Sequence, residues 1–542
     1  MTEVTTRPPL SVAGADPWAP ERRPVRLPAP APSAARDAAL VGAMVVLAAL
    51  LRVPTLGRAY WVDEGISVGI ASHHLSQIPG LLRLDGSPPL FYMLLHFWVG
   101  AFGSTQVSTH VMSLIISLVL VPVAWWCGWR LFGRRVALYA ALLAATSPFL
   151  NWYATESRMY PLVCGLAMVA VTCSIAAVLY ESRLYFAGAV VAFVALLYTH
   201  NWSLYLFAVT VAVLLIWAAI RRDRRQARWV LAGAGIVLAA YAPWIPSLLS
   251  QVQHTGAPWA IPPSLGDLFS DPASVLGGTL GFLVVPLFAA GAALTWVYRP
   301  SRANRTTALL AAIGLGTLLA GWLIAQVKPT WTSRYLAVAL GPLLLALAGA
   351  LGGSWLGRRI IAVAVAMLVT WSVVGSLLPD PNARYAKSNV AAIAAAAGPQ
   401  LDPGDVVVVT QSEQVAVLAH YLPAGLRYVT PTGPVADPSV VDWRDLVGRL
   451  QRANPCRTVA PAIAALPPGA HVLVVNPYRH LGASWTTWAR TDNAQVAADN
   501  QLVLRDPGMS EVQSYWEATE PKPYSAVDAA LFVRTASPAA CS

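Results

Sequence analysis

The sequence predicts a polytopic α-helical membrane protein that carries a C-terminal extracytoplasmic α/β domain. Of its 542 residues, 56% are hydrophobic and only 12% are charged, which is about half the charged share of an average soluble domain. The apolar residues are gathered in long blocks, as they are in membrane-spanning helices. After residue 378 this pattern changes to polar residues and short β-branched runs, which predict a separate domain over 379–542.

The apolar blocks predict about eleven membrane-spanning helices within residues 37–378. These blocks lie at 38–54, 107–132, 136–150, 160–180, 184–198, 203–220, 229–249, 275–297, 307–327, 335–352 and 360–378. Residues 1–36 are rich in Pro, Ala and Arg and contain no apolar run, so we expect a disordered cytoplasmic tail there.

Basic residues form short clusters between the blocks, at 134–135, 221–225, 299–305 and 358–359. Such clusters are typical of cytoplasmic loops in membrane proteins. The net charge of +11 therefore reflects topology and does not indicate a nucleic-acid partner. We expect a multi-pass plasma-membrane protein with a cytoplasmic N-terminus and an extracytoplasmic C-terminal domain.

One apolar stretch, residues 88–103, does not fit this alternation of sides. Counting it as a span would place every later Arg cluster outside. The stretch is short and opens with two prolines. We therefore expect a helix that lies in the outer membrane interface, anchored by its aromatic residues, within an outer loop at 57–106.

The C-terminal region has the composition of a small α/β domain. Val406–Thr410 and Val472–Val475 are predicted strands, and Val415–Leu422 is a predicted helix. Cys456 and Cys541 are the only cysteines in this region. Because an extracytoplasmic compartment permits disulfides, we expect these two residues to be bonded.

Chemically capable side chains collect in the loops that this topology places on the outer face. Ionisable groups are nearly absent from the centres of the blocks, where a proton-coupled transporter would be expected to place some. The sequence therefore indicates chemistry at the outer boundary. The candidate residues are Arg58, Tyr60, Trp61, Asp63, Glu64, Tyr92, Glu156, Arg158, Tyr160, His200, Lys328, Arg334 and Tyr335, and the first outer loop also carries His73 and Asp85.

These residue types suit the transfer of a sugar from a phosphate to a hydroxyl. A carboxylate such as Asp63 or Glu64 can take the proton of a hydroxyl nucleophile. Cationic side chains are expected to compensate a departing phosphate, a role for which the sequence offers Arg58, Arg158, Lys328 and Arg334. The Trp and Tyr side chains offer faces for a sugar ring, and Glu156 and His200 are further candidate substrate contacts.

Structural roles are open for the same residues. Two carboxylates in the first turn of a helix also favour its dipole, and a lone Arg at a membrane boundary is commonly an interfacial anchor. Aromatic residues at the outer ends of spans commonly form the aromatic belt. The functional interpretation depends on a coincidence: acids, bases and aromatic residues from five separate loops all lie on one side of the membrane in this topology.

The motifs, in this order, resemble those of the GT-C superfamily of integral membrane glycosyltransferases over residues 38–378. They are most similar to the protein O-mannosyltransferases, the lipid A aminoarabinose transferases and the rhizobial core galacturonosyl transferases. Two positions depart from that pattern: Ser87 stands where relatives often have His or Lys, and His110 stands where an Arg precedes a Pro-Ser pair. The matching motifs are Trp61-Val-Asp63-Glu64, Ser87-Pro-Pro-Leu-Phe-Tyr92, Ala154-Thr-Glu156-Ser-Arg158-Met-Tyr160, Thr199-His200 and Arg334-Tyr335-Leu336.

The resemblance implies a polyprenyl-phosphate sugar donor and inversion at the anomeric carbon. It implies Asp63 as the catalytic base, with Glu64 orienting the acceptor or supporting a divalent cation, which the sequence itself does not require. The Ala-, Arg- and Pro-rich composition is similar to that of high-GC actinobacteria, in which lipid-linked mannose and arabinose build envelope glycans. Mannose is therefore the expected sugar, and an envelope glycan, lipoglycan or protein is the expected acceptor.

Three other functions stay open on the sequence. One is an arabinosyl or other pentosyl transferase with the same donor class. The others are a lipid-linked sugar transporter and a noncatalytic envelope assembly protein. The position of the acids at the outer boundary disfavours the transporter, and the retained Asp63-Glu64 pair disfavours the noncatalytic protein.

Overall fold

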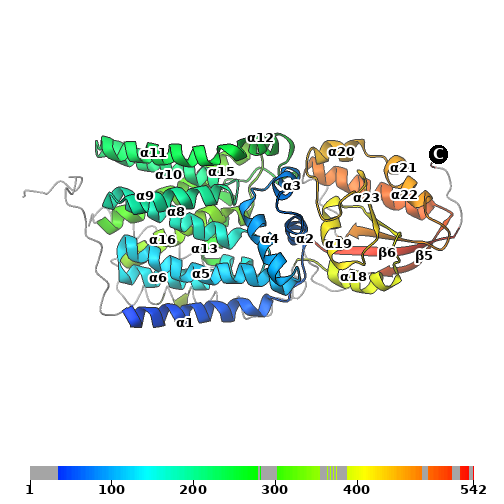
Figure 1. Ribbon diagram of the computed structural model, residues 1–542, viewed down its shortest axis with the longest axis horizontal. Helices are drawn as coiled ribbons and strands as arrows, with labels where there is room; N and C mark the ends of the chain where they lie inside the picture. Colours follow the sequence, from blue (N-terminus) through cyan, green and yellow to red (C-terminus); the bar gives the residue numbers. More distant parts are fainter. Residues whose placement is uncertain are drawn as a thin grey trace, which may run out of the picture.

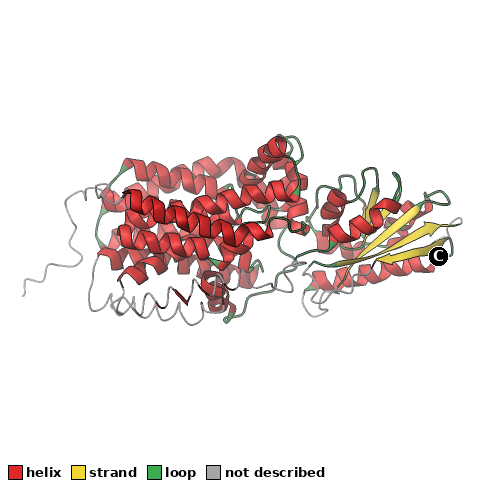
Figure 2. Cartoon of the chain, turned by 90° about the horizontal axis from the view of Figure 1, so that it is seen from below, coloured by secondary structure: helices red, strands yellow, loops and turns green. Residues whose placement is uncertain are grey.

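The computed structural model describes residues 34–278, 302–353, 387–478, 486–515 and 525–535, together with isolated positions that include Cys541. The chain forms a long helical bundle with a smaller sheet-containing domain at one end (Figure 1; Figure 2). The predicted class, a helical membrane protein with a C-terminal α/β domain, is confirmed.

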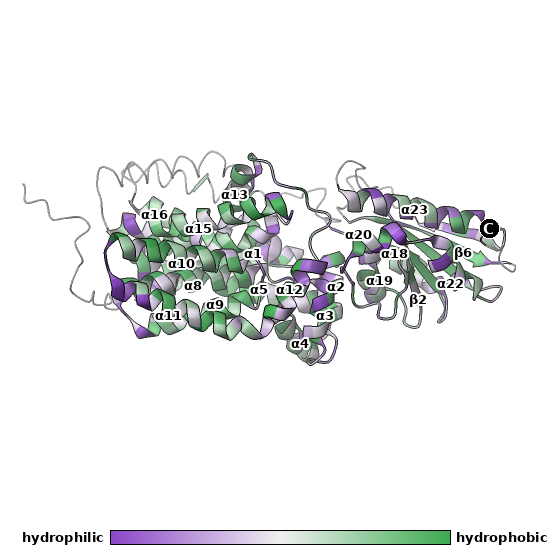
Figure 3. Cartoon of the chain, turned by 90° about the horizontal axis from the view of Figure 1, so that it is seen from above, coloured by the Kyte–Doolittle hydropathy of each residue, from purple (hydrophilic) through white to green (hydrophobic). Residues whose placement is uncertain are grey.

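The bundle consists of long apolar helices that run along the long axis of the molecule (Figure 1). Hydrophilic residues gather at its far end and in the short helices next to the C-terminal domain (Figure 3). The bundle helices are α1 (Ala34–Arg52), α5 (Gln106–Phe132), α6 (Arg134–Thr146), α8 (Tyr160–Tyr180), α9 (Arg183–Leu197), α10 (Ser203–Ile220), α11 (Arg224–Tyr241), α15 (Arg302–Val327) and α16 (Ala337–Gly353).

Among the described residues, seven helical segments are long and apolar enough to cross a membrane. The predicted blocks at 136–150 and 184–198 are helices α6 and α9, of only 13 and 15 residues. Most of the block at 275–297 and most of the block at 360–378 lie outside the described residues. Helix α1 begins at Ala34, earlier than the predicted block, because it includes a polar first turn.

Short helices lie at the end of the bundle that faces the C-terminal domain (Figure 1). The apolar stretch at 88–103 is confirmed as a helix, α4, whose 13 residues are fewer than a span requires. The short helices are α2 (Val62–Ala71), α3 (Ile78–Asp85), α4 (Leu90–Phe102), α7 (Pro148–Tyr153), α12 (Ile245–His254) and α13 (Asp267–Gly277).

The C-terminal domain is a six-stranded mixed sheet in the order β3-β2-β1-β4-β6-β5. Strand β1 pairs in parallel with β2 and β4, and β6 pairs antiparallel with β4 and β5. The strands are β1 (Val406–Val409), β2 (Arg427–Thr430), β3 (Gly433–Pro434), β4 (His471–Pro477), β5 (Met509–Tyr515) and β6 (Val527–Arg534). The predicted strands at 406–410 and 472–475 are therefore confirmed.

Helices cover both faces of this sheet, which explains the unbroken valine run of β1. Val406 and Val408 pack into one core, and Val407 and Val409 pack into the other. Central strands covered on both sides are expected to be apolar at every position. The domain's helices are α18 (Val390–Ala397), α19 (Val415–Tyr421), α20 (Leu446–Arg452), α21 (Pro455–Thr458), α22 (Ala460–Ala464) and α23 (Thr487–Arg505).

The domain packs closely on helix α2, and two glycines of α2 permit this approach. A Cβ atom at Gly65 would lie 2.7 Å from the backbone of Val417 in α19. A Cβ atom at Gly69 would lie 2.1 Å from the carbonyl oxygen of Ser439. Helix α2 therefore forms a close packing contact between the bundle and the C-terminal domain.

Cys456 and Cys541 are joined by a disulfide that closes a segment of 85 residues. In the chain-entropy treatment, closing a loop of this length stabilises the domain by about 4–5 kcal/mol. We expect Cys456→Ser to lower the free energy of unfolding of the domain by roughly this amount, measured by urea-dependent proteolysis. Cys173→Ser, which removes a buried free thiol of the bundle, is the matched control. Finding five free thiols in the unreduced native protein would contradict the pairing.

Candidate active site at the end of the bundle near the C-terminal domain

A cavity of about 280 Å³ lies at the end of the bundle that faces the C-terminal domain. Its walls come from α2, α10, α12, the end of α15, the turn that precedes α16, and one residue of the C-terminal domain. Loop residues at 85–88, 158–159, 200–202 and 255–259 complete the lining. Of the candidate residues, those that line this cavity are Asp63, Arg158, His200, Lys328, Arg334 and Tyr335.

Asp63 stands in the first turn of α2, where two arginines from distant parts of the chain meet its carboxylate. Its Oδ2 lies 3.8 Å from Arg158 Nη2 and 3.6 Å from Arg334 Nη1. Arg158 is held further by hydrogen bonds to the Ser67 hydroxyl, at 2.9 Å, and to the backbone carbonyl of Asp63, at 3.3 Å. The two ion-pair distances exceed hydrogen-bond length, and Oδ2 has no hydrogen-bond partner within the described part of the chain. The Asp63 carboxylate lines the cavity and therefore keeps one acceptor oxygen that no hydrogen bond occupies.

Glu64 points away from the cavity into a buried network. Its Oε1 accepts hydrogen bonds from His110 Nε2 and from the backbone N–H of Ser157, both at 2.7 Å. Burial raises the pKa of the Glu64 carboxyl, but the charge and hydrogen bond of His110, aided by Lys387 and Ser157, lower it below its ordinary value overall. Glu64 does not line the cavity, so the structure gives no support for a direct contact between Glu64 and an acceptor. Neighbouring residues on a helix point about 100° apart, which is why Asp63 and Glu64 face different surroundings.

Asp85 is a second carboxylate of the cavity, which the sequence placed in the outer loop without a role. It ends α3, and its Oδ2 accepts a hydrogen bond of 3.2 Å from the Tyr92 hydroxyl. Burial raises the pKa of Asp85, and the Arg158 charge offsets only part of this effect. Tyr92 itself is buried and does not line the cavity. Its hydroxyl bonds to two residues that do, Asp85 and Arg158.

His200 lines the cavity as a neutral ring. Burial, followed by the charges of Arg158 and Arg334, lowers its pKa to about 3. Its Nδ1 accepts a hydrogen bond from the backbone N–H of Trp202 at 3.2 Å, and its ring packs edge-on against Tyr335 with centroids 4.9 Å apart. His200 can therefore contact substrate as a neutral hydrogen-bonding group and not as a cation.

Lys328 lines the cavity from the end of α15, and its ammonium donates a hydrogen bond to the Val252 carbonyl. Burial lowers its pKa. It therefore reaches the cavity from the wall formed by α12 and α15.

Glu156 is fully buried beside the cavity and forms an ion pair with Lys387. Burial raises the pKa of Glu156, and the Lys387 charge counters this only in part. The Lys387 ammonium also lies 5.9 Å from the centre of the Trp61 ring. Lys387 was not predicted, because it follows the last apolar block with no motif around it, and only the folded chain brings it to Glu156.

Several candidate residues support the site without lining the cavity. Tyr60 is buried and bonds to Thr109 and to the backbone carbonyl of Ser104, so a sugar contact by Tyr60 is not supported. Residues in such supporting positions are Arg58, which lies over the Trp152 ring, Tyr60, Trp61, Tyr92, Glu156 and Tyr160. The described residues contain no group of three or more His, Cys, Asp or Glu side chains placed to hold a metal ion.

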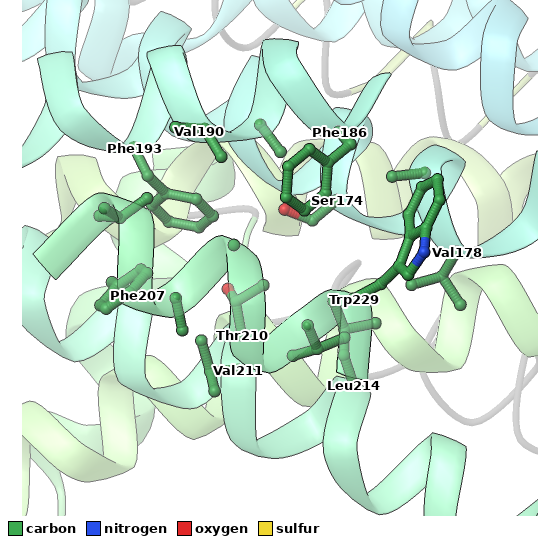
Figure 4. Close-up of a pocket in the computed structure, with 16 residues that line it drawn as sticks. Ser174, Val178, Phe186, Val190, Phe193, Phe207, Thr210, Val211, Leu214 and Trp229 are labelled. Carbon is green, nitrogen blue, oxygen red and sulfur yellow. The ribbon is translucent and has the colours of Figure 1, made fainter. Parts of the chain in front are cut away.

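A second cavity lies among α8, α9, α10 and α11, and its walls are apolar and aromatic (Figure 4). The hydroxyls of Ser174 and Thr210 donate to the carbonyls of Ala170 and Leu206 in their own helices. Without an ionisable group in its lining, this cavity is not a candidate for catalysis.

The fold and the charged cavity define a polytopic helical membrane protein with its polar site at one end of the bundle. The family model described as dolichyl-phosphate-mannose-protein mannosyltransferase matches residues 86–246. No curated protein matches the chain in sequence.

Solved structures of two other proteins share the fold. ArnT from Cupriavidus metallidurans bound to undecaprenyl phosphate is 15% identical with a TM-score of 0.59, covering 94% of this chain and 99% of that one. Its apo form is 14% identical with a TM-score of 0.56, covering 82% and 93%. The Archaeoglobus fulgidus oligosaccharyltransferase is 10% identical with a TM-score of 0.50, covering 85% and 72%. The chain thus has the fold of the GT-C membrane glycosyltransferases, and the predicted resemblance is confirmed at this level.

Proposed function

We propose that this protein is an inverting glycosyltransferase that takes a sugar from a polyprenyl-phosphate donor at the outer face of the membrane. The observation that carries the proposal is the meeting of Asp63 with Arg158 and Arg334 in one cavity. A base and a pair of phosphate-binding cations are the two requirements of this reaction.

The donor phosphate is placed in this proposal against the two guanidinium groups. Arginine grips phosphate oxygens bidentately and stays charged at physiological pH. The negative charge that leaves with the phosphate is then compensated by Arg158 and Arg334, with Lys328 on another wall of the cavity. Arg58, which does not line the cavity, is not included.

Asp63 is the proposed base. As the bond between sugar and phosphate breaks, the Asp63 carboxylate takes the proton of the attacking hydroxyl. The same carboxylate favours the positive charge that develops on the sugar ring. Attack from the face opposite the phosphate gives inversion at the anomeric carbon.

The relatives support the donor class. The ArnT structure contains undecaprenyl phosphate, and the oligosaccharyltransferase structure carries an acceptor peptide. Mannose is our first choice of sugar, supported by the mannosyltransferase description of the matching family model, and an envelope glycan, lipoglycan or protein is the acceptor class. An arabinosyl or other pentosyl transferase is the alternative within this mechanism.

A panel of synthetic polyprenyl-phosphate sugars, supplied to the purified protein in lipid vesicles, tests the proposal. We expect release of polyprenyl phosphate from one member of the panel, with mannose tested first and arabinofuranose second. Movement of the intact donor across the bilayer without release would identify a transporter instead. No release and no binding of any donor would indicate a noncatalytic protein.

The arginines give a further prediction. Replacing Arg158 or Arg334 with Lys keeps the charge but loses the bidentate geometry, so donor KM should rise by roughly 10–100-fold, since a charged hydrogen bond contributes about 1.5–3 kcal/mol. Arg83→Lys is the matched control, because Arg83 lies in the same outer loop but bonds to Ser247 outside the cavity. Unchanged donor kinetics in both Lys variants would leave these arginines as structural anchors.

A further inference from the structure

We propose that the C-terminal domain completes the acceptor site, and that Trp443 and Trp259 form a platform for a carbohydrate acceptor. This inference rests on the proposed function and names the acceptor class. Trp443 is the described residue of the C-terminal domain that lines the cavity. Trp259 lines the same cavity from the loop after α12.

The segment that carries Trp443, residues 437–445, is held against the bundle by backbone hydrogen bonds. The N–H of Trp443 donates to the carbonyl of Leu84 at 3.0 Å, and the N–H of Asp445 donates to the carbonyl of His254 at 2.8 Å. Both acceptors belong to the short helices that frame the cavity. These two hydrogen bonds therefore fix the position of the segment on the bundle at Trp443 and two residues beyond it.

Side-chain pairs hold the same segment at its two ends. His73 Nε2 lies 2.7 Å from Asp437 Oδ2, and His254 Nδ1 lies 3.1 Å from Asp445 Oδ2. The close approach of Gly69 to the carbonyl of Ser439 fixes the middle. These contacts all join the domain to the bundle, and together they fix the position of one aromatic side chain.

The two indoles form a compact aromatic wall. Trp443 and Trp259 pack edge to face, with centroids 4.9 Å apart and planes at 65°. Within the described residues, the buried Nε1–H of Trp259 has no hydrogen-bond partner. Trp488 packs behind Trp259 at 6.5 Å and does not line the cavity.

This chemistry suits a sugar ring. The C–H face of a sugar packs on an indole, since tryptophan offers a large apolar face. The donor-binding residues come from the bundle, whereas Trp443 comes from the other domain. Loss of Trp443 should therefore affect the acceptor and spare the donor.

Saturation-transfer NMR on the full-length protein, with no donor present, tests this inference separately from the proposed function. The probes are a methyl α-mannotrioside, a methyl α-arabinofuranotrioside and a threonine-containing hexapeptide. We expect saturation of at least one trisaccharide by the wild-type protein and by Trp488→Phe, the matched control. Trp443→Leu should weaken that binding by about tenfold.

Three results would overturn the inference: saturation of the peptide alone, saturation of no probe, or unchanged trisaccharide binding by Trp443→Leu. Donor binding, measured separately with polyprenyl phosphate, should be equal in all three proteins. If donor binding is absent from the wild type while trisaccharide binding depends on Trp443, the proposed function fails and the carbohydrate platform stands.

Discussion

Replacing Asp63 with Asn should lower the rate of sugar transfer by about 10²–10⁴-fold, the usual contribution of a general base. The substitution keeps the shape of the side chain and removes its ability to take a proton. It also removes the negative charge shared by Arg158 and Arg334, so binding of polyprenyl phosphate should be equal or tighter. The measurements are single-turnover transfer from a saturating donor and equilibrium binding of polyprenyl phosphate.

Asp85→Asn is the matched control, because Asp85 is the other carboxylate that lines the cavity. We expect a smaller loss of transfer in this variant, since Asp85 accepts a hydrogen bond from Tyr92, and burial raises its pKa despite the nearby charge of Arg158. If Asp85→Asn abolishes transfer while Asp63→Asn retains the wild-type rate, the base is Asp85 and Asp63 only positions the arginines.

The helical bundle, the short apolar helix α4 and the central strands could be predicted because their signals are local. A valine run buried on both faces, or an apolar block bounded by arginines, has the same meaning wherever it lies in a chain. Helices α6 and α9 are shorter than the ~20 residues of a straight span. Their roles depend on neighbouring helices, which the sequence does not specify.

The candidate site was predicted only in part, because some of its residues lie in recognisable motifs and others do not. Asp63, Arg158 and Arg334 belong to motifs whose order carries a resemblance, and the fold brings them together. The direction of Glu64 could not be predicted, because it depends on which face of α2 is turned toward His110 of α5. Lys387 and Trp443 lie outside any motif and reach the site only through the docking of the second domain.

The buried pair of Glu64 and His110 should make a large contribution to stability. His110 Nδ1 donates to the carbonyl of Leu56 at 2.8 Å, and its Nε2 faces the Glu64 carboxylate, so both ring nitrogens donate and the ring is charged. Glu64→Ala leaves this cation buried without a partner, which should cost about 3–5 kcal/mol. The thermal midpoint of the purified protein in detergent measures the loss, compared with His110→Ala and with the double variant.

The double variant should be less destabilised than the sum of the single variants, because it removes both charges together. The effect should also depend on pH. The folded-state pKa of Glu64 lies below its ordinary value of 4.5, so its contribution is complete above about pH 4.5 and is lost as pH falls through the lowered value. The wild-type midpoint should therefore fall more steeply below this pH than that of Glu64→Ala. Equal slopes with additive losses would show that the two side chains are independent, and would return Glu64 to consideration as a residue of the chemistry.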